Sequence, residues 1–222
     1  MPRMLNEVLK FPTDCPSCGA STTTDSCVID IPHFKEAIIM SLACEKCGFK
    51  SNDVKGGGEI LPHGTIITLR AETLNDMSRD VIKSDTACVA LPEIEFELQE
   101  SGLGLCTTVE GLLLKMHDDL KESNPFASAG DGSSSSSSST TQDKFEMFLT
   151  KLKSIVEGKC FPFTLVITDP LSNSFVGPIP ENGEQFVHSN YPIIPHDKGI
   201  TIEEFQRSHE QNENLGLNDV RT

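Results

Sequence analysis

The sequence predicts a mainly β protein in two parts: a four-cysteine ribbon, followed by a β sandwich or jelly roll that carries a helical insertion. Three observations predict this fold class. Two Cys-x-x-Cys pairs lie in the first 50 residues, many short β-rich runs are separated by turn residues, and two central segments repeat apolar residues at helical spacing. A chain of 222 residues can form one β core and a small metal-held unit.

The two cysteine pairs predict a structural zinc site formed by Cys15, Cys18, Cys44 and Cys47. A two-residue spacer lets both thiolates of a pair reach one ion, and Zn²⁺ prefers four soft ligands in a tetrahedron. Because four cysteines complete that coordination, no position is left for a reacting water or substrate. Redox dithiols and disulfides are the alternatives, but neither pair follows a strand and opens a helix, as thioredoxin-like chemistry requires.

The segment between the cysteine pairs predicts a β-hairpin. Its β-rich runs, Cys27–Ile31 and Ala37–Leu42, bracket a tip that contains His33. With four cysteines in place, a tip histidine is expected to contact a partner or solvent rather than the metal. Three successive glycines then mark the end of the ribbon, which we place at residues 1–58.

Short strands predict a β domain over residues 59–200. In Glu93–Leu98 the strict alternation places three carboxylates on one face of a strand. The other strands are expected at Gly64–Ala71, Arg79–Lys83, Ala87–Ala90, Phe161–Thr168, Ser174–Val176 and Gln185–His188.

A helical hairpin is expected to interrupt the β domain at residues 107–158. A capping-box pattern, Thr107 to Glu110, predicts a first helix over 107–122, and a second helix is expected from Asp143 to a stop at Gly158. The Ser-rich tip, 127–141, is expected to be disordered because it cannot bury enough apolar surface. The last segment, 201–222, is predicted to begin with a short helix at Thr201–Glu210.

The net charge of the chain limits which kinds of molecule it can bind. The chain has 18 Lys and Arg against 33 Asp and Glu, a net charge of −15, so its surface repels nucleic-acid backbones and anionic lipid and favours basic partners. No apolar stretch of about 20 residues and no signal peptide is evident, so we expect a soluble intracellular protein. Reduced thiols are expected at the four remaining cysteines, Cys27, Cys88, Cys106 and Cys160.

Two other function classes remain as alternatives. A zinc-ribbon nucleic-acid-associated or transcription-related factor would need a basic face, against which the net charge argues. A jelly-roll enzyme would need convergent polar residues, but the other histidines lack the paired spacing of cupin-type metal ligands. The Gly56–Gly58 run also lacks the Lys-Ser/Thr of a phosphate-binding loop, so no catalytic residue is predicted and the protein is expected not to be an enzyme.

A set of motifs identifies a resemblance over nearly the whole chain. In the first part the motifs are Cys15–Cys18, Ile31–Glu36, Ile38–Met40, Cys44–Gly48 and Asn52–Lys55. In the second part they are Arg79–Ser84, Thr107–Leu112, Asn124–Phe126, Asp169–Pro170, Asn173–Ser174 and Gln211–Asp219. On these residues the chain resembles the eukaryotic ZPR zinc-finger family, named for zinc-finger proteins associated with a growth factor receptor.

The resemblance implies a more specific fold and function. Family members look like tandem repeats of a four-cysteine finger and a double-stranded β-helix (jelly-roll-like) domain with a helical hairpin, and this chain resembles the second, C-terminal unit. It is then a fragment, a truncated paralogue or a single-module relative. The resemblance implies one structural Zn²⁺ and a chaperone or adaptor for translation elongation factor 1 alpha, with a possible contact to the cytoplasmic region of a growth factor receptor, in cytoplasm and nucleus.

The expected partner contact lies on the ribbon hairpin, at His33, Phe34 and Lys35. Two departures from the family pattern are visible: Gly56 stands where the family commonly has Ser, and the hairpin tip carries an unusual Ser run. Neither departure touches the cysteines.

Overall fold

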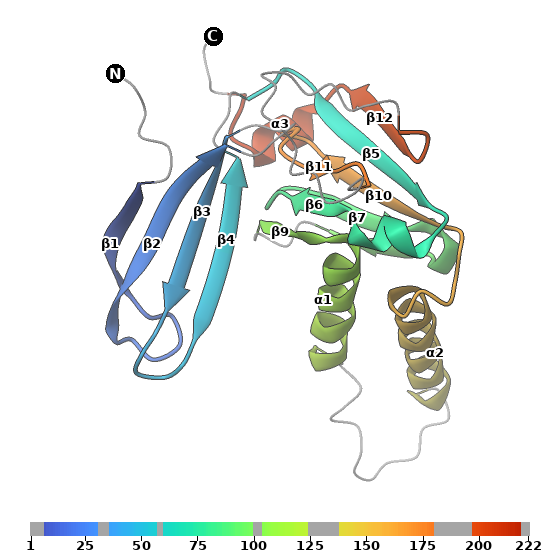
Figure 1. Ribbon diagram of the computed structural model, residues 1–222, viewed down its shortest axis with the longest axis horizontal. Helices are drawn as coiled ribbons and strands as arrows, with labels where there is room; N and C mark the ends of the chain where they lie inside the picture. Colours follow the sequence, from blue (N-terminus) through green and yellow to red (C-terminus); the bar gives the residue numbers. More distant parts are fainter. Residues whose placement is uncertain are drawn as a thin grey trace.

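The computed structural model describes residues 7–30, 36–56, 60–99, 104–123, 138–179 and 197–218. In these residues three antiparallel sheets form a four-stranded ribbon on one side and a two-sheet β domain beside it, from which two helices project (Figure 1). The mainly β fold class with a helical insertion is confirmed. None of the described helices combines the length and the apolar composition of a membrane span.

The ribbon is an antiparallel meander in which each strand pairs with the next along the chain. Its strands are β1 (Val8–Asp14), β2 (Ser21–Asp30), β3 (Glu36–Ala43) and β4 (Lys50–Gly56). Pairing continues up to both cysteine knuckles, since Asp14 pairs with Ser21 and Ala43 with Lys50. The predicted β2–β3 hairpin is confirmed, and its tip, 31–35, lies outside the described residues.

The β domain has a five-stranded sheet in the order β12-β5-β10-β7-β8 and a three-stranded sheet in the order β11-β6-β9. The first contains β5 (Gly64–Ala71), β7 (Cys88–Leu91), β8 (Phe96–Leu98), β10 (Phe163–Asp169) and β12 (Ile200–Phe205). The second contains β6 (Asp80–Lys83), β9 (Leu105–Thr108) and β11 (Phe175–Val176). Two 3-10 turns connect strands. The turn η1 (Leu74–Ser78) lies between β5 and β6 and so links the two sheets, and η2 (Pro92–Ile94) lies between β7 and β8 of the five-stranded sheet.

One apolar core joins both sheets to the helices α1 (Val109–Glu122) and α2 (Ser138–Val156). Strand β10 alternates between fully and partly buried positions, as expected for a strand with one face on a core. Its Phe163, Leu165 and Ile167 pack in the same cluster as Leu113 of α1 and Leu152 of α2. Burial of these side chains, each worth roughly 1.5–3 kcal/mol, fixes the hairpin on the β domain.

The prediction of a helix at Thr201–Glu210 is wrong for its first half. Residues Ile200–Phe205 form strand β12, which pairs along β5 from Leu69 to Gly64. The segment is polar enough to suit either structure, and the unpaired backbone of the β5 edge decides in favour of a strand. A short helix, α3 (His209–Asn214), follows it.

The single strand expected at Glu93–Leu98 is also wrong in its first half. Pro92 starts the 3-10 turn η2, because proline has no amide proton for a sheet ladder but suits the first position of a helical turn. Glu95 then takes a left-handed conformation with φ of 53°. The strand begins only at Phe96, so the three glutamates do not follow one strand face.

Both helices begin at residues other than those predicted. Thr107 belongs to β9 and pairs with Val81, so the predicted capping box does not form. Instead Thr108 caps α1 by accepting a hydrogen bond from the Gly111 amide at 3.2 Å. Helix α2 begins at Ser138, so the last residues of the tract expected to be disordered are helical. Adding residues to a helix that is already packed costs little once it is nucleated. The remaining tip, 124–137, and the strand expected at 185–188 lie outside the described residues.

Candidate metal centre

The four cysteine sulfurs meet at one point of the ribbon. The Sγ atoms of Cys15, Cys18, Cys44 and Cys47 all lie within 4.8 Å of one another. Two cross-knuckle pairs, Cys15 to Cys47 and Cys18 to Cys44, are both 3.7 Å apart. A zinc–sulfur bond of about 2.3 Å gives a tetrahedron with edges of roughly 3.8 Å, so this sulfur set fits one Zn²⁺.

The two knuckles have the same backbone geometry. In the first, the Cys15 amide donates to the Ala20 carbonyl at 2.8 Å and the Gly19 amide donates to the Cys15 carbonyl at 2.8 Å. The second repeats both bonds with Cys44, Gly48 and Phe49. Gly19 and Gly48 have φ values of 67° and 76°, a region that side chains disfavour, so a glycine suits the position after each pair.

Local packing and amide dipoles prepare the cage for a metal. The first cysteine of each knuckle, Cys15 or Cys44, is buried with Leu42 in a small apolar cluster, while Cys18 and Cys47 are exposed. The backbone amides of Cys47 and Lys46 lower the pKa of the Cys44 thiol to about 7, against the smaller opposing effect of burial. The Cys18 thiol shifts the other way: the Ala20 amide acts to lower its pKa, but contacts with the other three cysteines and desolvation raise the pKa to about 12. The cage therefore reaches its four-thiolate form by releasing protons as the metal binds.

Among the described residues, these cysteines are the one group of His, Cys, Asp and Glu placed to hold a metal. The other four cysteines lie apart from the cage, half-buried at Cys27 and Cys88 and exposed at Cys106 and Cys160. Although Cys106 is exposed as a residue, surrounding atoms partly shield its thiol from water, and this desolvation, together with the charge of Asp80, raises the pKa of the thiol and disfavours its nucleophilic form. The predicted contact residues His33, Phe34 and Lys35 lie outside the described residues.

A junction between the ribbon and the β domain was not visible in the sequence. Val54 of β4 packs with Ala37 of β3, Ile82 of β6 and Phe175 of β11 in a second apolar cluster. Beside it, the Gly104 amide donates to Oδ1 of Asp53 at 3.0 Å. The ribbon is therefore attached to the β domain through both apolar and polar contacts.

Two buried charged residues in the resemblance motifs have structural partners. The carboxylate of Asp169 is fully buried. It accepts hydrogen bonds from the turn between β6 and β7 and from the segment that follows its own strand, β10. Its partners are the hydroxyls of Ser84, Thr86 and Ser174 and the amides of Leu171 and Asn173. These contacts join strand β10 to the β6–β7 turn, so this carboxylate supports the fold.

Arg79 is another buried charged residue, with 2% of its surface exposed. Its guanidinium donates to Oδ1 of Asp76 at 2.8 Å, to the Gly177 carbonyl at 3.1 Å and to Oδ1 of Asp197 at 3.2 Å. The planar fork thus holds three separate segments together, and the charge is neutralised by two carboxylates. The one sequence signal for this role is a basic residue at the start of the strand predicted at Arg79–Lys83.

A closed four-sulfur cage on a β ribbon, attached to a jelly-roll domain, defines a zinc-ribbon protein whose metal is structural. Comparison with known proteins identifies the family. A family model of the ZPR1 zinc-finger domain matches residues 7–62, and one of the ZPR1 jelly-roll domain matches residues 75–217. The chain belongs to the ZPR1 family, which confirms the resemblance and the zinc cofactor.

Individual relatives agree with this assignment. The chain is 41% identical over 218 residues to the zinc finger chaperone zpr1 of Schizosaccharomyces pombe, covering 98% of this chain and 44% of that protein. It is 40% identical to the human zinc finger protein ZPR1, covering 43% of that protein. A ZPR1-like protein of Methanocaldococcus jannaschii is 29% identical, with 85% of this chain and 90% of that protein covered. The chain therefore spans less than half the length of its fungal and animal relatives.

Proposed function

We propose that this chain is a zinc-stabilised protein-binding module that acts as a chaperone or adaptor for translation elongation factor 1 alpha. The observation that carries the proposal is the sulfur cage, in which four cysteines complete the coordination of one ion. A metal with no open position maintains a shape and carries out no reaction. The fungal relative is named a zinc finger chaperone, which supports a binding role and a protein partner.

The charge of the chain supports a basic client. A net charge of −15 attracts a basic protein over long range, and such steering weakens as salt rises. The same charge disfavours direct contact with nucleic acid or an anionic membrane. We place the protein in cytoplasm and nucleus, with the cytoplasmic region of a growth factor receptor as a further possible partner, and we assign it no catalytic activity.

The contact surface in this proposal is the tip of the ribbon hairpin, at His33, Phe34 and Lys35. Aromatic side chains, Phe among them, are enriched in the cores of protein interfaces. Phe11, on strand β1 of the same ribbon, is half-exposed and provides a matched aromatic control.

The test is capture of purified elongation factor 1 alpha by zinc-loaded protein at low and at high salt. Phe34→Ala is expected to weaken capture at least tenfold with zinc content unchanged, whereas Phe11→Ala leaves it intact. Capture that is unaffected by Phe34→Ala would remove the hairpin tip from the interface. Recovery of nucleic acid from lysate in place of a basic protein would favour the nucleic-acid-associated alternative.

A further inference from the structure

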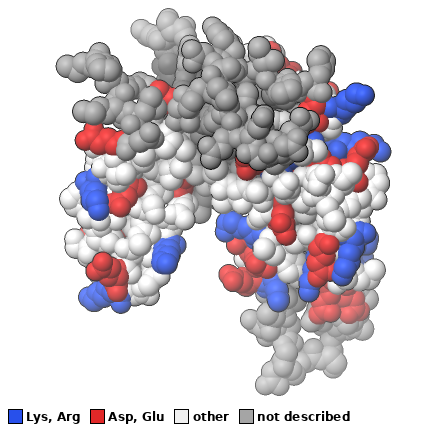
Figure 2. Space-filling view, in the orientation of Figure 1, with Lys and Arg blue, Asp and Glu red and all other residues white. Residues whose placement is uncertain are grey.

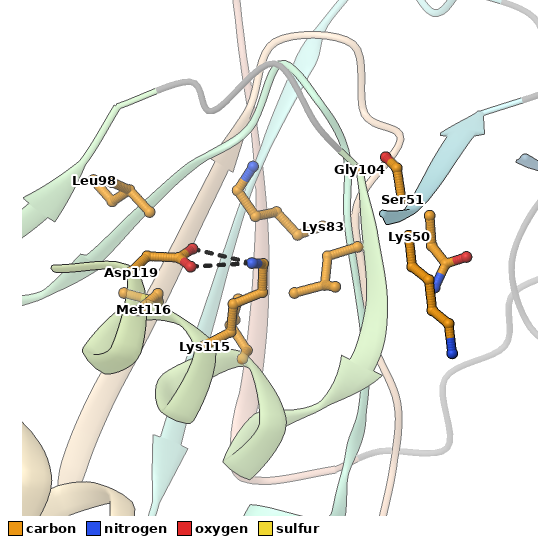
Figure 3. A pocket seen from close by; sticks show the side chains of 11 residues that line it. Lys50, Ser51, Lys83, Leu98, Gly104, Lys115, Met116 and Asp119 are labelled. Carbon is orange, nitrogen blue, oxygen red and sulfur yellow. Dashed lines mark hydrogen bonds and ion pairs between the residues drawn. The ribbon is translucent and has the colours of Figure 1, made fainter. Parts of the chain in front are cut away.

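A cavity of about 470 Å³ lies where the ribbon, the β domain and helix α1 meet. Lys50 and Ser51 of ribbon strand β4 line one side of it, and Lys115, Met116 and Asp119 of α1 line the other (Figure 3). In the space-filling view the molecule is hollowed between the ribbon and the helical part, with basic side chains on both walls of the notch and acidic side chains beside the basic ones on the helical wall (Figure 2). The volume falls within the roughly 300–1,000 Å³ typical of binding pockets.

The described residues that line this cavity carry a net positive charge, although the chain as a whole is negative. Lys50, Lys83 and Lys115 come from three different elements, β4, β6 and α1. Among the described residues that line it, Asp119 alone is acidic, and it already pairs with the Lys115 ammonium at 3.1 Å. Since acidic residues outnumber basic ones by 33 to 18 in the chain, this lining is a local reversal of charge.

Lys83 brings its charge to a buried position. It is the last residue of β6, is 3% exposed, and its ammonium donates to the Ser84 carbonyl at 2.9 Å. A charge removed from water interacts more strongly with a nearby anion than one on an open surface. Lys83 therefore adds a positive charge to the β-domain wall of the cavity, although its ammonium already has hydrogen-bond partners.

The rest of the lining is apolar. Leu98 and Leu105 come from the β domain, and Leu112 and Met116 come from the buried face of α1. A ligand that fits must combine negative charge with apolar groups. Three lysines on separate elements suit carboxylates spaced along an extended chain better than one phosphate, which needs convergent donors.

We propose that this cavity binds an extended peptide segment in which Asp or Glu alternates with aliphatic residues. The proposal rests on the proposed function, because a module that docks proteins would receive such a segment from its partner. The carboxylates face the lysines while the aliphatic side chains lie against Leu105, Leu112 and Met116. Recognition is local, so the partner as a whole can still be basic.

The test measures binding of a fluorescein-labelled six-residue peptide of alternating leucine and aspartate to the zinc-loaded full chain. A second peptide carries asparagine in place of aspartate, and inorganic phosphate is added as a competitor. The variant is Lys115→Glu, and the matched control is Lys121→Glu, which makes the same charge change at an exposed position of the same helix. Zinc content and circular dichroism confirm that both variants are folded.

Saturable binding of the aspartate peptide is expected, weakened roughly tenfold by Lys115→Glu or by asparagine and left nearly unchanged by Lys121→Glu. Equal weakening by both lysine variants would mean general attraction and would overturn the proposal, as would the absence of saturable binding. If inorganic phosphate displaces the labelled peptide at the same concentration as the unlabelled peptide does, the cavity binds a simple anion instead. Loss of peptide binding with intact capture of elongation factor 1 alpha by Lys115→Glu would support the peptide site and would show that its segment comes from a partner other than the factor. Failure of the wild-type chain to capture the factor while it binds the peptide would overturn only the proposed client.

Discussion

The backbone of Gly104 lies directly against the carbonyl oxygen of Val54. A Cβ atom built at position 104 would be 1.7 Å from that oxygen, far inside van der Waals contact. The adjoining hydrogen bond from the Gly104 amide to Asp53 shows that the approach is specific. Here the ribbon and the β domain meet backbone to backbone, which only glycine permits.

Gly104→Ala is therefore expected to push β4 away from β9 and to disturb the apolar cluster around Val54. We expect a loss of about 2–4 kcal/mol in the free energy of unfolding, measured by urea denaturation. Gly177→Ala is the control, because a Cβ there would meet its nearest neighbour at an acceptable 3.4 Å. Similar losses in the two variants would contradict the close contact at Gly104.

Replacing one metal ligand, Cys47→Ser, is expected to lower bound zinc from one per chain to well below one, because a site of three thiolates binds more weakly. Amide exchange should then speed up in β1–β4, while β5 and β10 stay protected by the separate core of the β domain. Cys160→Ser, at an exposed cysteine away from the cage, should change neither measurement. Full zinc occupancy in Cys47→Ser would show that this sulfur is not a ligand.

Asp169→Asn keeps the side-chain shape but replaces an acceptor oxygen with an NH₂ group. Both carboxylate oxygens accept hydrogen bonds, from Thr86 and Leu171 on one and from Ser84, Asn173 and Ser174 on the other, so either orientation of the amide places donor against donor. A loss of about 3 kcal/mol in stability is expected. Asp143→Asn, on the exposed face of α2, should cost little. A stable Asp169→Asn protein would mean that the carboxylate charge is dispensable.

The pair of carboxylates around Arg79 predicts a pH dependence. Burial is the largest single influence on Asp76 and Asp197 and acts to raise both pKa values, but the Arg79 guanidinium together with nearby backbone amides outweighs it and holds both pKa values below their usual range. A carboxyl with a depressed pKa in the folded state stabilises the protein above its unfolded pKa of about 4, and that stability is lost as pH falls through the folded pKa.

Asp76→Asn should therefore lower stability most at neutral pH, and the difference from wild type should shrink as pH falls below about 4. Urea denaturation of both proteins across this range measures the difference, which also cancels acid effects on the zinc site that are common to both. A difference that stays constant down to pH 3 would contradict the ion pair.

The sequence predicted those elements whose structure depends on residues close together in the chain. The knuckles at Cys15 and Cys44 were predicted from spacing alone, and strand β10 from its alternation. Most of the strand Ile200–Phe205 was wrongly predicted as part of a helix, because an edge of β5 about 130 residues away in the chain determines its structure. The contact of Gly104 with Val54 and the lysine-lined cavity likewise bring together segments that share no local pattern.

The position of β12 has a consequence for how the chain is made. This strand completes one edge of the five-stranded sheet only when residues 200–205 are available, and Asp197 just before it also neutralises the buried Arg79. The ribbon, by contrast, contains all its ligands and strands within residues 8–56. During translation the ribbon can thus fold and acquire zinc as soon as residues 8–56 have left the ribosome, whereas the sheet of the jelly roll stays incompletely paired until residues 197–205 have been synthesised.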